Sequence, residues 1–220
     1  MATEKKVQRY VTIFFIAFVG GFITKLPYIM GSYYTALELA TGATRMQLGM
    51  LSTIYGIVNF IVYLPGGYLA DRVSAKKLVV IGALGTAVFG LWYAALPGFI
   101  WLLVIHMGFA VTSVFIFWAA MVKAVNNLGT DAEQGKMFGF LEGSRYLVGI
   151  LAMYGSIAVF GQFTDEVAGF KGSSFITASA WPWRVSWSPY SSRNPSGARR
   201  ILRRRRRREK SFPSSSLKRF

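Results

Sequence analysis

The sequence predicts an all-α membrane protein, a multi-pass bundle of transmembrane helices. Of its 220 residues, 53% are apolar and only 15% are charged, and the mean hydropathy is +0.40. An average soluble domain carries about 25% charged residues. Five stretches are long and apolar enough to cross a bilayer, whose hydrocarbon core of about 30 Å requires about 20 residues of helix. Lipid is therefore the expected solvent of most of the chain.

The five predicted spans follow one another within the first 172 residues. The second, third and fourth contain no Asp, Glu, Lys or Arg. A helix at a water boundary would carry a polar stripe, so these segments are expected to face lipid or other helices. The approximate bounds of the five spans are residues 10–28, 48–69, 78–96, 98–122 and 137–163.

Basic residues are distributed unevenly between the two sets of connecting segments. Those on the side of the N-terminus hold eight Lys and Arg residues, and those on the other side hold only Arg45 and Lys171. Positive residues are retained on the cytoplasmic side during insertion, so the N-terminus is predicted to be cytoplasmic. The basic start also resembles a secretory signal. No small-x-small cleavage site follows, however, and the first span is interpreted as an anchor that stays.

The last 48 residues differ in composition from the rest. Residues 1–172 have a net charge of +4, whereas residues 173–220 have a net charge of +12 and contain 12 serines, 4 prolines and an unbroken arginine run at residues 203–208. No apolar window in this part approaches 20 residues. The sequence therefore predicts a membrane unit at residues 1–172 and a disordered Ser/Pro/Arg-rich tail at residues 173–220.

Several classes of chemistry are excluded by composition or motif. The chain has no cysteine and one histidine, His106, which excludes disulfides, thiolate metal sites and histidine metal clusters. Phosphate-binding loops, dinucleotide fingerprints and the G-x-S-x-G hydrolase motif are absent from the sequence. The protein is therefore predicted not to be an enzyme and to need no cofactor or metal.

Residues 67–77, between the second and third spans, have the sequence Gly-Tyr-Leu-Ala-Asp-Arg-Val-Ser-Ala-Lys-Lys. They resemble the signature G-x-x-x-D-R/K-x-G-R/K-R/K of the major facilitator superfamily, with Ser74 and Ala75 where that pattern prefers glycine and a basic residue. This family places the signature on the cytoplasmic side, where the charge count also places this segment. Topology alone would explain the basic residues but not the glycine four residues before the aspartate. The resemblance implies a gating role for Gly67, Asp71, Arg72, Lys76 and Lys77.

Residues 133–139, Glu-Gln-Gly-Lys-Met-Phe-Gly, resemble the E-R/Q-G-x-x-x-G entry to the fifth helix of bacterial members that carry sugars and organic anions. The fifth span lacks the proline-centred pattern of proton antiporters, so drug:proton antiport is less favoured. In this family two six-helix halves surround a central site and rock about it. The resemblance covers residues 1–172, the first five helices of the first half. It implies that a sixth helix, due near Ser173, and the whole second half are missing.

Five polar side chains within the spans are candidates for substrate binding, because a Lys or Arg at a helix centre costs about 2.5–3.5 kcal/mol on insertion scales. Glu142 lies three residues before Arg145 on the same helix face, so an internal ion pair would lower the burial cost of both. Basic groups outnumber the one acid, which favours an anionic or polyhydroxylated substrate. The candidates are Lys25, Asn59, His106, Glu142 and Arg145.

Each candidate also has a structural interpretation. Lys25 can extend to the outer interface, and Asn59 can serve only to hydrogen-bond between helices. His106 is either a satisfied interior histidine or a proton-titrating group facing the cavity. The pair of Glu142 and Arg145 is as compatible with a structural role as with a functional one.

These observations predict a secondary active transporter, a permease that moves a small polar solute such as a sugar or organic anion by alternating access in a bacterial inner membrane. Its expected partners are the solute, with or without a coupling ion, membrane lipid and the missing C-terminal half, and no nucleic acid. The alternative is a small membrane protein whose polybasic tail binds anionic lipid or nucleic acid.

Half of a rocking pair has no surface to rock against, so the chain alone is expected to be inactive. The abrupt tail suggests an aberrant, out-of-frame end.

Overall fold

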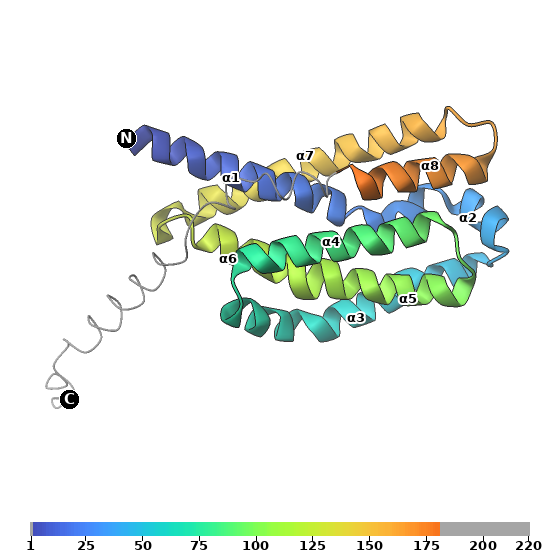
Figure 1. Ribbon diagram of the computed structural model, residues 1–220, viewed down its shortest axis with the longest axis horizontal. Coiled ribbons are helices and arrows are strands. Elements are labelled where there is room, and N and C mark those ends of the chain that lie inside the picture. Colours follow the sequence, from blue (N-terminus) through green and yellow to red (C-terminus); the bar gives the residue numbers. More distant parts are fainter. Residues whose placement is uncertain (1, 181–220) are drawn as a thin grey trace, which may run out of the picture.

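The computed structural model describes residues 2–180, and side chains from residue 7 onward. In this part of the chain every regular element is helical, and the long helices lie side by side in one bundle (Figure 1). The elements are α1 (Ala2–Ile23), η1 (Leu26–Ser32), α2 (Tyr34–Thr41), α3 (Arg45–Arg72), α4 (Ala75–Ala94), α5 (Phe99–Phe109), η2 (Ala110–Trp118), α6 (Ala119–Asn126), η3 (Asp131–Glu133), α7 (Gln134–Phe160) and α8 (Glu166–Ser179).

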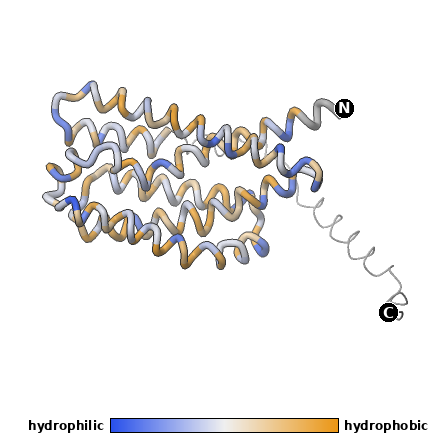
Figure 2. The backbone as a smooth tube through the Cα atoms, turned by 180° about the vertical axis from the view of Figure 1, so that it is seen from behind, coloured by the Kyte–Doolittle hydropathy of each residue, from blue (hydrophilic) through white to orange (hydrophobic). Residues whose placement is uncertain are grey.

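The predicted all-α membrane bundle is confirmed. Four helical stretches are long and apolar enough to cross a membrane, namely α3, α4, the continuous stretch α5–η2–α6, and η3 with α7. The bent pair α1 and η1 makes a fifth if it counts as one span. Strongly hydrophilic segments gather mainly at the two ends of the bundle (Figure 2). This distribution is the one expected for a bundle whose middle lies in hydrocarbon.

The first predicted span, residues 10–28, is interrupted. Its α-helix ends at Ile23, and the chain continues as the 3-10 segment η1, bent by 49° from α1. Pro27 accounts for the break, because proline has no N–H to donate to the carbonyl four residues earlier and its ring clashes with that carbonyl. Lys25 lies at this bend, immediately before η1.

The second and third spans are joined by only two residues, Val73 and Ser74. The signature segment is therefore mostly helical: Asp71 and Arg72 lie in the last turn of α3, and Ala75 begins α4. Ser74 is the N-cap of α4, since its hydroxyl accepts the N–H of Lys77. This role explains how serine serves at a position where the family pattern prefers glycine.

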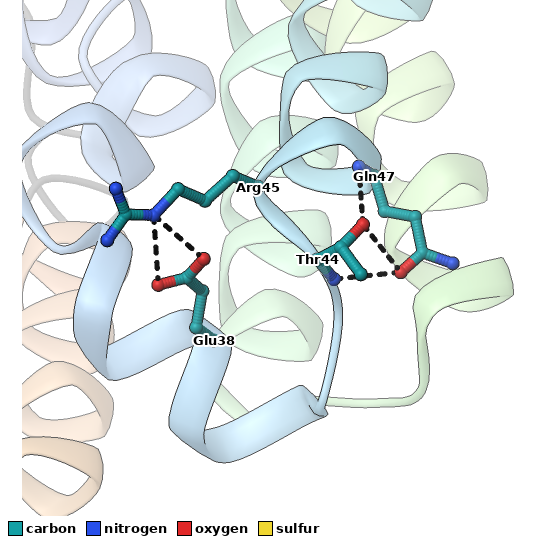
Figure 3. A network of polar contacts seen from close by, with 4 residues as sticks. All are labelled: Glu38, Thr44, Arg45 and Gln47. Carbon is teal, nitrogen blue, oxygen red and sulfur yellow. Dashed lines mark hydrogen bonds and ion pairs between the residues drawn. The ribbon is translucent and has the colours of Figure 1, made fainter.

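At its other end α3 is fixed by polar contacts in the segment that follows α2 (Figure 3). Thr44 caps α3 in a capping box with Gln47, in which each side chain accepts the other's backbone N–H. Arg45 Nε donates to Glu38 Oε1 of α2 at 3.1 Å. These contacts satisfy free N–H groups of the helix end and hold α2 against the start of α3.

The fourth span contains a π-helical stretch, η2, between α5 and α6. Two glycines allow neighbouring helices to approach it closely. A Cβ at Gly66 of α3 would lie 2.9 Å from the Phe115 carbonyl oxygen, and a Cβ at Gly82 of α4 would lie 2.8 Å from the Thr112 carbonyl oxygen. The hydroxyls of Thr86 and Thr112 also join α4 to η2 at 2.9 Å. Small residues and short polar contacts thus pack the middle of the bundle.

A further helix, α8, corrects the predicted domain boundary. It begins at Glu166, with Asp165 capping it, and ends at Ser179. The predicted boundary at residue 172 lies inside this helix, so residues 173–179 belong to the bundle and not to the tail. Ser173 and Thr177 are buried with bonded hydroxyls: Ser173 donates to the Ser156 carbonyl of α7 at 2.8 Å, and Thr177 donates to the Ser173 carbonyl at 2.7 Å. The remainder of the predicted tail, residues 181–220, lies outside the described residues.

Gly82→Ala is expected to destabilise the bundle, because its Cβ would meet backbone atoms of η2. Gly56→Ala is the matched control, since no described atom lies within 4 Å of a Cβ at that position of α3. Both substitutions gain up to about 1 kcal/mol of helix propensity. Overpacking at residue 82 costs about 1–3 kcal/mol. Thermal unfolding in detergent, followed by circular dichroism, should show a lower midpoint for Gly82→Ala only. Equal midpoints would contradict the close approach.

Candidate functional site

The candidate site lies where α1, η2 and α7 meet. Arg145 of α7 is buried, with 8% of its surface exposed, and its Nη1 donates to the Thr24 hydroxyl at 3.2 Å. A Cβ at Gly20 of α1 would lie only 3.3 Å from Arg145 Cδ. The absence of a side chain at Gly20 therefore leaves the room in which the arginine side chain crosses to α1.

The Arg145 guanidinium is held on several sides. Its Nε donates to Glu142 Oε2 at 3.1 Å, and its Nη2 also contacts that oxygen, so the predicted ion pair is formed in the structure. Its Cζ lies 5.1 Å from the ring centroid of Trp118 and 4.6 Å from that of Tyr146. Aromatic faces attract a cation electrostatically, which lowers the cost of holding this charge away from water.

Lys25 lies on the other side of the same helix contact. A Cβ at Gly149 of α7 would lie 2.7 Å from Lys25 Cε, so the lysine stem packs against that glycine. Lys25 is partly exposed. No ion pair or hydrogen bond of its ammonium group is found among the described residues. Because Glu142 offsets the charge of Arg145, the cluster retains one unbalanced positive charge, on Lys25.

Asn59 is placed on a different face of the bundle. It interacts with Tyr55, one turn earlier on α3, and the Tyr55 hydroxyl lies 3.3 Å from the hydroxyl of Ser113 on η2. The Asn59 Oδ1 atom is buried and has no hydrogen-bond partner among the described residues. The amide thus adds a free acceptor to a polar contact between α3 and the π-helical stretch.

His106 is fully buried in the interior of the bundle, and no surface of it faces solvent. Its Nδ1 lies 2.8 Å from the Leu102 carbonyl oxygen, and its ring packs edge-on with Tyr93 and Phe109. The structure therefore does not bring His106 together with Lys25 and Arg145. Its substrate-binding role stays a prediction, without support from this arrangement.

The signature residues lie at the end of the bundle where the first span begins, and one contact links them to the fourth span. Lys123 of α6 lies 3.5 Å from Asp71 Oδ1 and also contacts the Ala70 carbonyl. Arg72 packs over the ring of Tyr68 with Cζ 4.2 Å from its centroid. The remaining gating candidates are the open Gly67, the partly buried Lys76 and the exposed Lys77.

The second motif forms contacts at the same end. Glu133 Oε2 lies 3.3 Å from Arg9 Nη1 of α1, and Gln134 Nε2 donates to the Asn126 carbonyl at the end of α6. Glu133 also closes a capping box with Thr130 before η3. These residues join the first, fourth and fifth spans at the end of the bundle that carries the signature segment.

Sequence patterns did not identify Thr24, Trp118 or Lys123 as site residues. Thr24 is the residue before Lys25 in the sequence, so its hydroxyl could have been identified as a site group from that position. Trp118 and Lys123 approach Arg145 and Asp71 only through the packing of the fourth span against α7 and α3. No spacing in the sequence encodes those contacts.

The Major Facilitator Superfamily model matches residues 11–204. The chain belongs to this family. It is 33% identical over 153 residues to the inner membrane protein YqcE of Escherichia coli, covering 70% of this chain and 35% of that protein. It is 27% identical over 171 residues to the E. coli inner membrane protein YihN, covering 78% and 40%. The E. coli inner membrane transport protein YajR is 29% identical over 130 residues, covering 59% and 27%.

The chain thus spans well under half the length of these relatives. It is an integral membrane protein of a family of transporters, and its match extends across all five spans and α8. The resemblance drawn from the signature segment is confirmed by this match.

A double-mutant cycle should separate the ion pair of the site from an exposed one. Glu142→Gln leaves a buried guanidinium without its counter-charge, which should cost about 1–3 kcal/mol of unfolding free energy in detergent, below the fully buried limit because the Glu142 side chain is 36% exposed. Arg145→Met combined with Glu142→Gln should cost less than the sum of the single changes.

The control for this cycle is the exposed pair of Glu38 and Arg45 (Figure 3), where the same changes should cost below about 1 kcal/mol. Unfolding free energies can be compared by titration with a denaturing detergent. Additive costs at Glu142 and Arg145 would show that the pair does not stabilise the site.

Proposed function

We propose that this chain forms the first half of a secondary active transporter that moves a small anionic or polyhydroxylated solute by alternating access. The observation that carries the proposal is the unbalanced ammonium of Lys25 beside the Glu142–Arg145 pair, at the contact between the first and fifth spans. An intramembrane charge without a counter-charge is costly and marks a pathway for polar solutes. A carboxylate or a group of hydroxyls would supply the missing partner.

The paired arginine suits the same class of solute. Its guanidinium is fixed by Glu142, Thr24 and two aromatic rings, so it is already oriented when a solute arrives. A preorganised donor loses little side-chain entropy on binding. Lys25 would then supply the charge that distinguishes an anion from a neutral sugar.

A second half of the transporter is part of the proposal. Two helices carry glycines against which no described residue packs: Gly49, Gly56 and Gly67 on α3, and Gly135, Gly139 and Gly143 on α7. Small residues allow close approach of another helix in a membrane. We expect these faces to meet that half. Asp71, Arg72, Lys76 and Lys77 would then act at the inner end, where opening and closing take place.

We further propose a bacterial inner membrane location with the N-terminus in the cytoplasm. The names of YqcE, YihN and YajR place those relatives in the inner membrane, and basic residues are concentrated at the end of the bundle that carries the signature.

Cysteine labelling should reveal the orientation, since the sequence itself contains no cysteine. A membrane-impermeant maleimide added to intact spheroplasts is expected to label Gln162→Cys, at the outer end of α7, but not Lys77→Cys, at the start of α4. Both variants should be labelled after lysis, because both positions are exposed. The reverse pattern would place the N-terminus outside.

Binding of the solute class can be tested on the purified chain by thermal stabilisation with D-glucuronate, D-glucose and choline. Glucuronate should raise the unfolding midpoint most, because its carboxylate can pair with Lys25. Loss of a charge-assisted hydrogen bond costs about 1.5–3 kcal/mol, so Lys25→Ala should weaken binding about ten- to a hundredfold, and Lys25→Arg less.

Lys171→Ala is the matched control, because Lys171 is an exposed basic residue on α8 outside the cluster. It should leave the glucuronate effect intact. Stabilisation by choline alone, or a glucuronate effect that survives Lys25→Ala unchanged, would overturn the anion proposal.

A further inference from the structure

The fourth span contains nine consecutive π-helical residues, Ala110–Trp118, between two α-helical parts. In a π-helix each N–H bonds the carbonyl five residues earlier; this form is rare beyond a single turn and is often found at functional sites. The alternative for the same residues is an α-helix, in which each N–H bonds four residues back. A π stretch of this length therefore needs specific contacts that hold it in the wider form.

Two hydroxyls of the stretch occupy carbonyls that an α-helix would use for its own backbone. Thr112 Oγ1 donates to the Gly108 carbonyl at 2.9 Å, and Ser113 Oγ donates to the Phe109 carbonyl at 2.5 Å. In an α-helix the N–H groups of Thr112 and Ser113 would bond these same carbonyls. Side-chain bonds of this kind compete with the backbone ladder. The two hydroxyls therefore favour the π form.

Neighbouring helices also leave room for the wider backbone. A Cβ at Gly66 of α3 would lie 2.9 Å from the Phe115 carbonyl oxygen, and a Cβ at Gly82 of α4 would lie 2.8 Å from the Thr112 carbonyl oxygen. The stretch is thus packed against a glycine on each of two neighbours. An α-helix closes its turn with fewer residues and is narrower, so the same space also admits the α form.

One buried acceptor beside the stretch has no partner in the π form. The Ser113 hydroxyl gives its one proton to the Phe109 carbonyl, so the Tyr55 hydroxyl, 3.3 Å from Ser113 Oγ, is the donor in that contact. Asn59 Oδ1, one turn after Tyr55 on α3, is left buried without a hydrogen bond in the part of the chain that the structure describes. A shift of Ser113 would release the Tyr55 proton for this acceptor. That exchange of partners satisfies a buried group and favours the α form.

Two contacts of the candidate site depend on residues at and beyond the C-terminal end of the stretch. The Trp118 ring lies 5.1 Å from Arg145 Cζ, and Lys123 Nζ lies 3.5 Å from Asp71 Oδ1. A shift of the hydrogen-bond ladder by one residue rotates the following helix by about 100° about its axis. Such a rotation turns both side chains away from their partners at the same time.

We propose that the fourth span switches between a π-helical and an α-helical hydrogen-bond register, and that this switch links the solute site to the signature segment. In the π register Trp118 faces Arg145 and Lys123 binds Asp71, whereas in the α register both contacts open. A solute carboxylate beside Arg145 weakens the attraction of the guanidinium for the Trp118 ring, so binding favours the α register. This effect of the solute rests on the proposed function, but the register change itself does not.

Spin labels at the two ends of the fourth span report its register in the full chain, purified in detergent, since the sequence contains no cysteine. Trp101→Cys and Asn126→Cys are both at exposed positions. Because an α-helix holds fewer residues per turn, the α register lengthens the span. Ser113→Ala removes a hydroxyl that favours the π register, so the distance distribution should shift to longer values.

Three further variants separate the register change from a general loss of packing. Thr112→Val removes the other hydroxyl with little change of shape, and should give the same shift independently of Ser113→Ala. Ser113→Thr keeps the hydroxyl and should leave the distribution unchanged. Thr53→Ala removes an equivalent bond on α3, from Thr53 Oγ1 to the Gly49 carbonyl, and should also leave it unchanged. Distributions in Ser113→Ala and Thr112→Val identical to that of the unsubstituted chain would overturn the switch.

A second label pair tests the link to the signature segment. Lys77→Cys at the start of α4 and Asn126→Cys at the end of α6 are both exposed. Their distance should change in Ser113→Ala together with that of the first pair, because α6 rotates against the end of α3. A change in the first pair alone would overturn the link.

The response to solute is measured with the same labels. D-glucuronate should shift both distances in the direction of Ser113→Ala, and Lys25→Ala should abolish this response. Thermal stabilisation by glucuronate without a change in distance would overturn the effect of the solute on the register and leave the proposed function intact. The absence of stabilisation and of a distance change would contradict the proposed function, while the solute-free comparison of Ser113→Ala still decides the switch.

Discussion

The cost of holding charge inside the bilayer shapes the contact between α1 and α7. A guanidinium in this environment requires a counter-charge, hydrogen-bond acceptors and close packing at once, and Arg145 has all three in Glu142, Thr24 and the aromatic rings of Trp118 and Tyr146. This contact brings the first and fifth spans together at the depth where Lys25 lies. The position of the proposed solute site is thus a consequence of how the arginine is satisfied.

Glycine makes the arrangement sterically possible. Arg145 of α7 lies over Gly20 of α1, and Lys25, at the end of α1, lies over Gly149 of α7. Each helix therefore supplies the space for the other's basic side chain. Dispersion contacts replace the hydrophobic effect as the main packing force between helices in lipid. Close packing of a long side chain on one helix against a glycine on the other increases these contacts. The same logic places Gly66 and Gly82 against the backbone of the π-helical stretch.

The sequence predicted those features that follow from hydropathy and from local spacing. Four apolar stretches became helices close to the predicted bounds, α3 continuing through Pro65, and the pairing of Glu142 with Arg145 followed from their separation by three residues. The first span was predicted as continuous because hydropathy is insensitive to the missing N–H of Pro27. The segment after residue 172 was assigned to the tail because Ser173, Ser174 and Thr177 lower its hydropathy, although in the fold these hydroxyls are buried between helices.

Contacts between distant spans could not be predicted in this way. Residues Lys123 and Asp71 are 52 positions apart, and Thr24 and Arg145 are 121 apart, so only the packing of whole helices brings them within reach. Such packing depends on the summed shape of many side chains. It also decides which polar groups remain free: Arg145 is satisfied, whereas the Lys25 ammonium and Nε2 of His106 are not. In a membrane interior water cannot satisfy a polar group, so a group without a partner carries a free-energy penalty until a ligand pairs with it. Free polar groups of this kind are therefore the strongest structural indication of ligand binding.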